Sequence, residues 1–322
     1  MKRRSLILSS TTAFVLPSSR ANAAERVIGW ISPESLETTA PFFSAFKQGL
    51  AANPFPDRST IRIIERYATG GAEAHTAAVA DLQQQRVALI VAQGAASVAV
   101  VKAKPSVPVV FGFSGDPVVA GLIDSLARPG GNATGVSFMS IELNPKRIDL
   151  LRFALPNCRR VALLSNPRHA GEENEIAACQ TAVKAHGIEL SVYRIQSATD
   201  TAGIVRRALD EGAQAMVALP SSFMVQQAAA IATLCLDRKV PLVSGWATFA
   251  RSGALLTFGP NLQEAYKRVA SYVVRVLGGR HPGDLPVEQP AVFELAVNVK
   301  AATALGISLP PSLLAQADIV ID

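Results

Sequence analysis

The sequence is poor in cysteine and in charged residues, and it has no apolar stretch long enough to span a membrane. Only 17% of its 322 residues are charged and 49% are hydrophobic, a composition typical of a packed protein. A membrane-spanning helix needs about 20 apolar residues, and charge or proline interrupts every long candidate here. The three cysteines lack metal-type spacing and predict either one disulfide or buried thiols: Cys158, Cys179 and Cys235.

Motifs of cofactor enzymes and of common hydrolases are also missing. The first predicted strand leads into residues 30–34 rather than into a GxGxxG loop, and no GxxxxGK[ST], HExxH or GxSxG motif occurs. The histidines are scattered, which favours surface or capping roles for His75, His169, His186 and His281. The sequence therefore predicts no cofactor, no metal site and no catalytic activity.

The amino terminus has the three parts of a secretory signal peptide. Basic residues 2–4 precede a short apolar run at residues 5–17, and a small-residue cleavage site ends at Ala23. The pair Arg3-Arg4 also fits a weak twin-arginine signal, so two export routes stay open. Removal of residues 1–23 takes away four basic and no acidic residues and lowers the formal net charge from +6 to +2. We expect a periplasmic protein that begins at Ala24 and has no nucleic-acid surface.

Short apolar, β-branched runs alternate with amphipathic segments along the rest of the chain. This alternation is typical of βα units that build parallel sheets. Strands are predicted at residues 27–31, 61–64, 87–92, 107–113, 134–138, 161–165, 188–193, 215–219, 240–243 and 254–258. Helices are predicted at residues 42–52, 72–85, 95–103, 145–155, 172–186, 201–211 and 224–238. We therefore expect an α/β fold with two doubly wound parallel-sheet lobes of five strands each.

The alternation changes after the tenth strand. A long helix is predicted at 262–277 with Asn261 as its N-cap, followed by a proline-containing link at 281–290, a strand at 293–298 and a helix at 300–305. We expect residues 24–138 and 260–282 to form lobe 1, and residues 139–259 and 283–322 to form lobe 2. The chain then crosses between the lobes three times, near 137–140, at 259–261 and along the link. These crossings predict a hinge at Ser137, Gly259 and Asn261.

Small polar residues recur where the predicted strands of both halves end. The carboxyl ends of the strands face a common cleft, and aromatic side chains beside convergent polar groups are typical of a small-molecule site. The polar residues can equally cap the helices that follow them, and Trp30 and Phe249 can equally belong to a lobe core. The predicted ligand-binding residues are Ser32, Gln93, Gly94, Phe113, Ser114, Asp116, Asn166, Ser221, Ser222, Trp246 and Phe249.

Two long segments resemble a known family. The run VPVVFGFSGDPVVAGLIDSLARPGGNATGVS ends at Ser137, and the chain closes with DLPVEQPAVFELAVNVKAATALGISLPPSLLAQADIVID. Both are similar to the substrate-binding proteins of ABC transporters in the tryptophan-transport-like group. The resemblance implies a type I periplasmic-binding fold that captures a small solute between two lobes and delivers it to an ABC permease and its ATPase. Asp116 matches the acidic residue that opens the family block. Because Pro117 follows it at the first position of a predicted helix, Asp116 can cap that helix or contact the ligand, and both roles stay open.

The chain departs from the family at two positions in the predicted cleft. Many members have two glycines and a hydroxyl residue where this chain has Gln93-Gly94-Ala95. Many have a tyrosine followed by Arg-Glu-Phe where residues 245–249 read GWATF, which removes both charges and adds an indole. A cleft of this kind depends less on a salt bridge and more on backbone amides and stacking, so the resemblance does not identify the solute.

These observations predict a monomeric periplasmic solute-binding component of an ABC importer. We expect an aromatic or branched amino acid, or a related small carboxylate, to place its carboxylate on helix N-termini near Gly94 and Ser222. Trp246 and Phe113 are expected to pack against its apolar part, and the lobes to close about the hinge. The alternative is a periplasmic sensor module of the same fold that reports to a membrane receptor.

Overall fold

The computed structural model describes residues 25–55, 57, 59–138 and 141–322. The predicted signal peptide, residues 1–23, lies outside the described residues. Within these ranges, no helix combines the length and hydropathy that a membrane-crossing segment requires. The three cysteines are buried free thiols, so of the two predicted alternatives, a disulfide or buried thiols, the second is confirmed.

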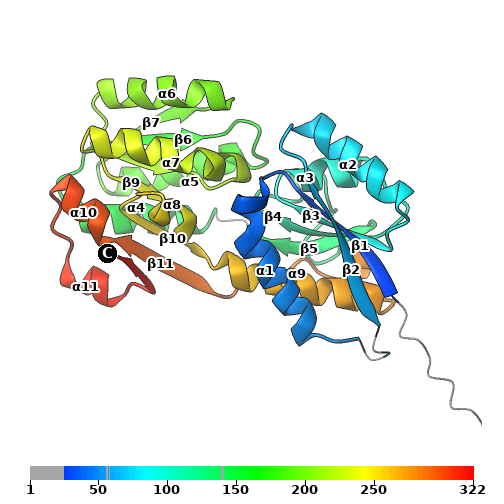
Figure 1. The fold of residues 1–322 in the computed structure, drawn as a ribbon. Helices are drawn as coiled ribbons and strands as arrows, with labels where there is room; N and C mark the ends of the chain where they lie inside the picture. Colours follow the sequence, from blue (N-terminus) through cyan, green and yellow to red (C-terminus); the bar gives the residue numbers. More distant parts are fainter. Residues whose placement is uncertain (1–24, 56, 58, 139–140) are drawn as a thin grey trace, which may run out of the picture.

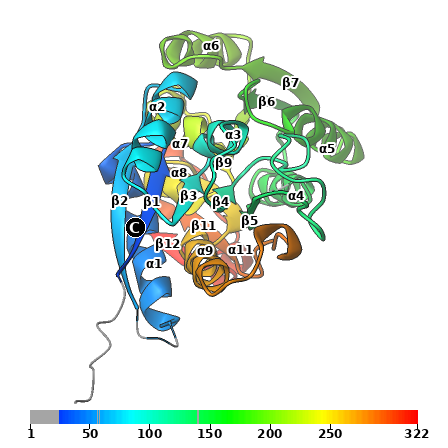
Figure 2. The same ribbon diagram turned by 90° about the vertical axis from the view of Figure 1, so that its right-hand side faces the viewer.

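The first lobe is built on a parallel sheet with the strand order β2-β1-β3-β4-β5. Its elements are β1 (Glu25–Ser32), α1 (Leu36–Ala52), β2 (Thr60–Tyr67), α2 (Ala72–Gln84), β3 (Leu89–Gln93), α3 (Ala96–Lys102), β4 (Val109–Phe113), β5 (Ala133–Ser137) and α9 (Leu262–Leu277). Strand side chains alternate between two apolar layers, so Ile28 and Trp30 face α1 and α9 while Ile31 and Ile90 face α2 and α3. Figure 2 shows α2 and α3 above this sheet and α1 and α9 below it.

The second lobe is built on a larger sheet with the strand order β12-β11-β10-β9-β8-β6-β7 (Figure 1). Its elements are α4 (Leu143–Ala154), β6 (Arg160–Ser165), α5 (Glu172–Ala185), β7 (Glu189–Arg194), α6 (Ala198–Asp210), β8 (Ala215–Ala218), α7 (Ser222–Asp237), β9 (Leu242–Ser244), α8 (Ala247–Arg251), β10 (Leu256–Pro260), β11 (Phe293–Asn298), α10 (Val299–Leu305), α11 (Pro311–Ala315) and β12 (Ile319–Ile321). Helices α4, α5 and α11 cover one face, and α6 and α7 cover the other. The sheet is parallel except at β11, which runs antiparallel to β10.

The predicted elements are confirmed, and several short ones were missed. All ten strands of the two predicted halves are present, and α9 begins and ends at the predicted residues with the Asn261 side chain as its cap. The missed elements are α8, α11, β12 and the 3-10 helix η1 (Pro282–Asp284). Each has five residues or fewer, which is too short for a hydrophobic period to be seen.

The link after α9 stays with the first sheet before the chain returns to the second. Glu288 exchanges backbone hydrogen bonds with Gly135 and Ser137 of β5, at 3.2 and 2.9 Å. The Thr134 hydroxyl donates to the Leu285 carbonyl oxygen at 2.7 Å. First-lobe packing therefore continues to residue 288, past the predicted lobe boundary after residue 282.

The predicted hinge residues lie at or beside chain crossings, and their function as a hinge stays a prediction. Asn261 caps α9, and its Nδ2 donates to Glu294 Oε2 at 2.7 Å, which ties the start of α9 to β11. Ser137 ends β5, and residues 139–140 of the crossing that follows lie outside the described residues. Gly259 lies in β10, where an added Cβ would stand 1.9 Å from the Gly245 carbonyl oxygen, so close backbone approach requires glycine.

A buried arginine of α4 anchors β10 beside the interface between the lobes. Arg147 of α4 is fully buried, and its Nε donates to the Phe258 carbonyl oxygen at 2.8 Å while its Nη1 donates to Asn144 Oδ1 at 2.6 Å. Burial lowers the pKa of Arg147 to about 10, opposed by the nearby Glu175, so the guanidinium remains charged at neutral pH. A Cβ at Gly245 would lie 2.5 Å from Arg147 Nη2. The arginine thereby fixes the loop after β9, which carries Trp246 next to Gly245.

The packing of α1 against α9 depends on Gly49. A Cβ at this position would lie 2.7 Å from the Lys267 carbonyl oxygen and 2.8 Å from the Ala270 Cβ. We expect Gly49→Ala to lower the free energy of unfolding, measured by urea denaturation, by about 1–3 kcal/mol. Gly203→Ala in α6 is the matched control, because no described atom lies within 4 Å of its added Cβ; helix propensity should raise stability there by up to about 1 kcal/mol. Equal losses in both variants would contradict this account.

Candidate functional site

The carboxyl ends of parallel strands from both sheets meet at one interface between the lobes. Gln93 ends β3 and Gly94 follows it, and Ser114 follows β4 of the first lobe. Ser222 follows β8 and Trp246 follows β9 of the second lobe. All five residues line one inner cavity, so the topology brings together segments that are far apart in the sequence.

The inner cavity is small and mainly enclosed by aromatic and polar side chains. Its volume is about 10 Å³, which is room for about one water molecule. Phe42 of α1 and Tyr266 of α9 form part of its wall from the first lobe, and Trp246 forms part of it from the second. The indole therefore fills space that a solute would otherwise occupy, and only a small chemical group fits in this arrangement.

Three buried polar atoms that line this cavity have no hydrogen-bond partner among the described residues. They are Glu34 Oε2, Gln93 Oε1 and Trp246 Nε1. Each buried polar atom left unpaired costs about 1–3 kcal/mol, and native proteins satisfy most such groups. Two of the three are acceptors and one is a donor, so they match a small group that both donates and accepts hydrogen bonds.

Glu34 is the acidic group of the cavity, and burial controls its protonation. The residue is 3% exposed, and loss of hydration raises its pKa from 4.5 to about 7, partly opposed by the nearby Ser222 hydroxyl. Burial and the nearby Glu34 raise the pKa of the buried Tyr266 hydroxyl well above 10, partly opposed by the Gln93 amide. Near neutral pH the carboxyl can therefore exist in both forms, and a cationic partner would favour the charged one.

A large chamber, here named the α2–α3 chamber, opens beside the inner cavity and shares Ser114 and Ser222 with it. It has a volume of about 620 Å³ and lies between α2 and α3 of the first lobe and α7 of the second. Its wall combines small apolar side chains with polar and charged ones, His75, Lys102 and Arg168 among them. Its size falls within the range of pockets for small organic ligands.

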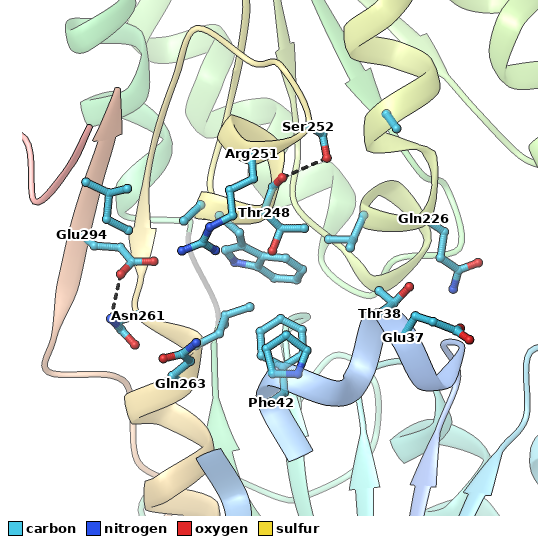
Figure 3. A pocket seen from close by; sticks show the side chains of 17 residues that line it. Glu37, Thr38, Phe42, Gln226, Thr248, Arg251, Ser252, Asn261, Gln263 and Glu294 are labelled. Carbon is cyan, nitrogen blue, oxygen red and sulfur yellow. Dashed lines mark hydrogen bonds between the residues drawn. The ribbon is translucent and has the colours of Figure 1, made fainter. Parts of the chain in front are cut away.

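A second chamber, here named the hinge-side chamber, lies on the other side of Trp246. Its volume is about 540 Å³, and α1, α7, α8 and α9 surround it. Figure 3 shows Arg251 and Phe42 directed into it from opposite sides. Glu37 and Glu294 also line it, and burial raises the pKa of Glu294, with Arg251 opposing the shift. The two chambers thus flank the inner cavity and differ in charge.

The lobes touch directly around the inner cavity. Gln226 Nε2 of the second lobe donates to the Pro33 carbonyl oxygen at 3.3 Å, and the Asp116 N–H donates to the Ala170 carbonyl oxygen at 3.1 Å. Gly94 has a φ of +50°, and a Cβ there would lie 2.1 Å from Ser222 Oγ. The chain therefore adopts an arrangement in which the lobes are closed on each other.

The structure brings most of the predicted ligand-binding residues to the cleft. The inner cavity includes Gln93, Gly94, Ser114, Ser222 and Trp246, and the α2–α3 chamber adds three more: Phe113, Asn166 and Ser221. Ser221 is also the N-cap of α7, where its hydroxyl accepts from the Met224 N–H. Their contact with a ligand stays a prediction.

The other three predicted residues line none of these three cavities. Ser32 Oγ accepts from the Glu34 N–H at 3.1 Å and so orders the turn after β1. Asp116 Oδ1 accepts from the N–H groups of Val118 and Val119, at 2.8 and 3.1 Å, and caps a turn. Phe249 is fully buried in the second lobe, and Trp30 is fully buried in the first. Both therefore belong to a lobe core, which was one of the two predicted roles for each.

Sequence reasoning missed Glu34, Tyr266 and two histidines. His75 is buried and the His169 side chain is 9% exposed, both at the α2–α3 chamber, so of the expected surface or capping roles the surface role does not apply to them. His186 pairs with Asp149 at the surface, and His281 caps η1, as expected. His75 shares the apolar stripe of its helix with Ala78, Val79 and Leu82, and that spacing was a usable signal.

The described residues contain no group of three or more His, Cys, Asp or Glu side chains that could hold a metal ion.

The amino-acid sequence matches a known family over nearly the whole described chain. Residues 27–321 match the family described as ABC transporter substrate binding protein. A curated relative, the tyrosine-binding protein of Clostridioides difficile (strain R20291), is 23% identical over 207 residues. That alignment covers 63% of this chain and 58% of the relative, so this chain spans less than two thirds of the relative's length.

Solved structures share the fold at low sequence identity. The ABC domain from Streptococcus pneumonia in complex with L-Trp superposes with a TM-score of 0.84 at 20% identity, over 92% of this chain and 100% of that chain. A conserved domain protein from Vibrio cholerae gives a TM-score of 0.83 at 23% identity, over 92% and 99% of the two chains. These likenesses confirm the predicted type I periplasmic-binding fold.

The raised pKa of Glu34 predicts a pH dependence of stability. Between its unfolded value of 4.5 and its folded value of about 7, the folded state binds more protons, so the free energy of unfolding falls as pH rises. We expect Glu34→Gln to remove this loss and to be more stable than the wild type by up to about 3 kcal/mol near pH 8, with little difference near pH 4. Urea denaturation at both pH values measures the change.

A nearby glutamate provides the control. Hydrogen bonds from its own backbone N–H and from Ser35 lower the pKa of the exposed Glu37, so Glu37→Gln should be slightly less stable than the wild type near pH 8. If Glu34→Gln shows the same sign as Glu37→Gln, the burial account of Glu34 is wrong.

Proposed function

We propose that this chain, which belongs to the ABC transporter substrate binding protein family, captures an aromatic or branched amino acid, or a related small carboxylate, between its two lobes. The family function is solute binding for an ABC transporter, and the solute class is the step that this proposal adds. Closure of the lobes places the polar head of the solute at the inner cavity, with its ammonium inside. The closed protein then presents the solute to the permease.

The unpaired atoms of the inner cavity carry this proposal. An ammonium group can donate to Glu34 Oε2 and Gln93 Oε1, while a carboxylate oxygen can accept from Trp246 Nε1. The head group of an α-amino acid contains both partners in one small unit. Its ammonium would also hold Glu34 in the charged form, and a buried carboxylate paired with a cation costs far less than an isolated one.

Two other observations support an aromatic or branched solute. Phe42, Phe138 and Trp246 provide apolar wall around the polar atoms. The curated relative binds tyrosine by its name, and the Streptococcus structure contains L-Trp, although both are only distantly similar. The sensory alternative has no observation in its favour beyond the shared fold.

The location and partners follow from the family and from the amino terminus. We infer that residues 1–23 direct export and are removed, that the mature protein works in the periplasm, and that it meets an ABC permease with its ATPase as a monomer. A thermal-shift screen of the chain from Ala24 against amino acids, aromatic acids and sugars tests the solute class. A solute at 100 times its Kd adds about 2.7 kcal/mol of stability, which such a screen detects.

The head-group contacts predict a loss of affinity on substitution. Glu34→Gln and Trp246→Ala should each weaken binding of the amino acid found in the screen about tenfold or more, because each removes a partner of a buried charged or polar group. Isothermal titration calorimetry near pH 8 measures the change. Thr248→Ala is the control, since Thr248 lines only the hinge-side chamber, and it should change Kd less than about twofold. Unchanged affinity in both cavity variants would refute the head-group assignment.

The close approach of Gly94 to Ser222 predicts that Gly94→Ala hinders closure. The added Cβ meets Ser222 Oγ at 2.1 Å, and the φ of +50° adds backbone strain. We expect weaker solute binding and a larger radius of gyration by small-angle X-ray scattering when the solute is present. Ser222→Gly in the same chain removes the opposing hydroxyl and should restore part of the affinity. No recovery in the double variant would point to local backbone damage instead of a block to closure.

A further inference from the structure

The α2–α3 chamber contains a buried hydrogen-bond acceptor that nothing described in the chain uses. His75 is 5% exposed, and one ring N–H donates to the Ala68 carbonyl oxygen. Its Nε2 is buried and has no partner among the described residues. Burial lowers the pKa of His75, so the ring is neutral at pH 7 and carries its proton on Nδ1. Nε2 is therefore an unpaired acceptor on a residue that lines this chamber.

The charges around this chamber all have the same sign. Lys102 of α3 and Arg168, in the loop before α5, line it, and no acidic residue is among its described lining residues. The amino-terminal ends of α2, at Gly71 and Ala72, and of α7 also border it and add positive dipole ends. A cationic group would be repelled here, whereas a neutral or anionic one is accommodated.

Size excludes the inner cavity as the place for the body of a solute. A cavity of about 10 Å³ holds about one water-sized polar group, such as an ammonium, so the rest of a solute needs the space of a chamber. The α2–α3 chamber shares Ser114 and Ser222 with the inner cavity, so a solute can extend from one into the other. The hinge-side chamber also adjoins it, but carries Glu37 and Glu294, and its only unpaired buried side-chain atom within the described residues is the shared Trp246 Nε1.

We propose that the side chain of the bound amino acid occupies the α2–α3 chamber and carries a hydrogen-bond donor, a phenol O–H or an indole N–H, that meets Nε2 of His75. His75 is then the residue that distinguishes donor-bearing aromatic solutes from those without a donor. The inference rests on the proposed function, because it assumes that the head group lies at the inner cavity with its ammonium inside.

Matched pairs of amino acids test the contact with His75. The probes are L-tyrosine with L-phenylalanine, and L-tryptophan with 1-methyl-L-tryptophan, titrated by calorimetry. We expect the donor-bearing member of at least one pair to bind about tenfold or more tightly to the wild type, because its partner leaves Nε2 buried and unpaired. In His75→Leu this ratio should fall to about one. A general loss of stability would weaken both members alike and leave the ratio unchanged.

Two alanine-to-phenylalanine variants test which chamber holds the side chain. Ala99 lies on α3 and lines the α2–α3 chamber, whereas Ala229 lies on α7 and lines the hinge-side chamber; neither is fully buried, so both tolerate a larger side chain. We expect Ala99→Phe to weaken binding of the donor-bearing probe about tenfold or more and Ala229→Phe to change it less than about twofold.

Several outcomes would overturn the inference. The first is equal affinity within both pairs in the wild type, and the second is a preference for the donor-bearing member that survives in His75→Leu. The third is a loss of binding in Ala229→Phe but not in Ala99→Phe. If none of the four probes binds while another class of solute raises Tm, the inference fails and solute capture stands. If no solute in the screen raises Tm, the proposed function itself fails.

Discussion

The burial of Glu34 at the interface between the lobes is the constraint on which the site depends. At this interface the Glu34 carboxyl is buried, and Glu34 Oε2, Gln93 Oε1 and Trp246 Nε1 have no hydrogen-bond partner among the described residues. Closure without a solute therefore carries an energetic penalty, whereas a solute with matching groups compensates for it. The same atoms thus couple two equilibria, the movement of the lobes and the occupation of the cavity.

The position of Trp246 is set by packing that lies outside the cavity. The buried Arg147 guanidinium binds the backbone of β10. Gly245 and Gly259 have no side chains, so β10 and the loop after β9 come into atomic contact. A side chain at either glycine would push the indole away from its place. The aromatic wall of the site is therefore supported by residues with no contribution to ligand chemistry of their own.

The sequence allowed the fold to be predicted more fully than the site. Long periodic segments such as α9 carry their own boundaries in caps and apolar stripes, so they were predicted to the residue. The antiparallel direction of β11 could not be read from its residues, because it follows from where the chain re-enters the second sheet. Residues at the ends of strands reached the cleft as predicted, but Tyr266 arrives from a helix packed across the sheet, and Glu34 owes its raised pKa to burial.

The return of the chain to the first lobe affects the order in which the protein can fold during synthesis. One face of the first sheet is covered by α1 together with α9, and α9 emerges from the ribosome only after most of the second lobe. Until then that face of the first sheet lacks part of its cover and exposes apolar surface, while the layer under α2 and α3 is already synthesised. Such long-range contacts slow folding, and a chain that folds late remains extended for longer after synthesis begins.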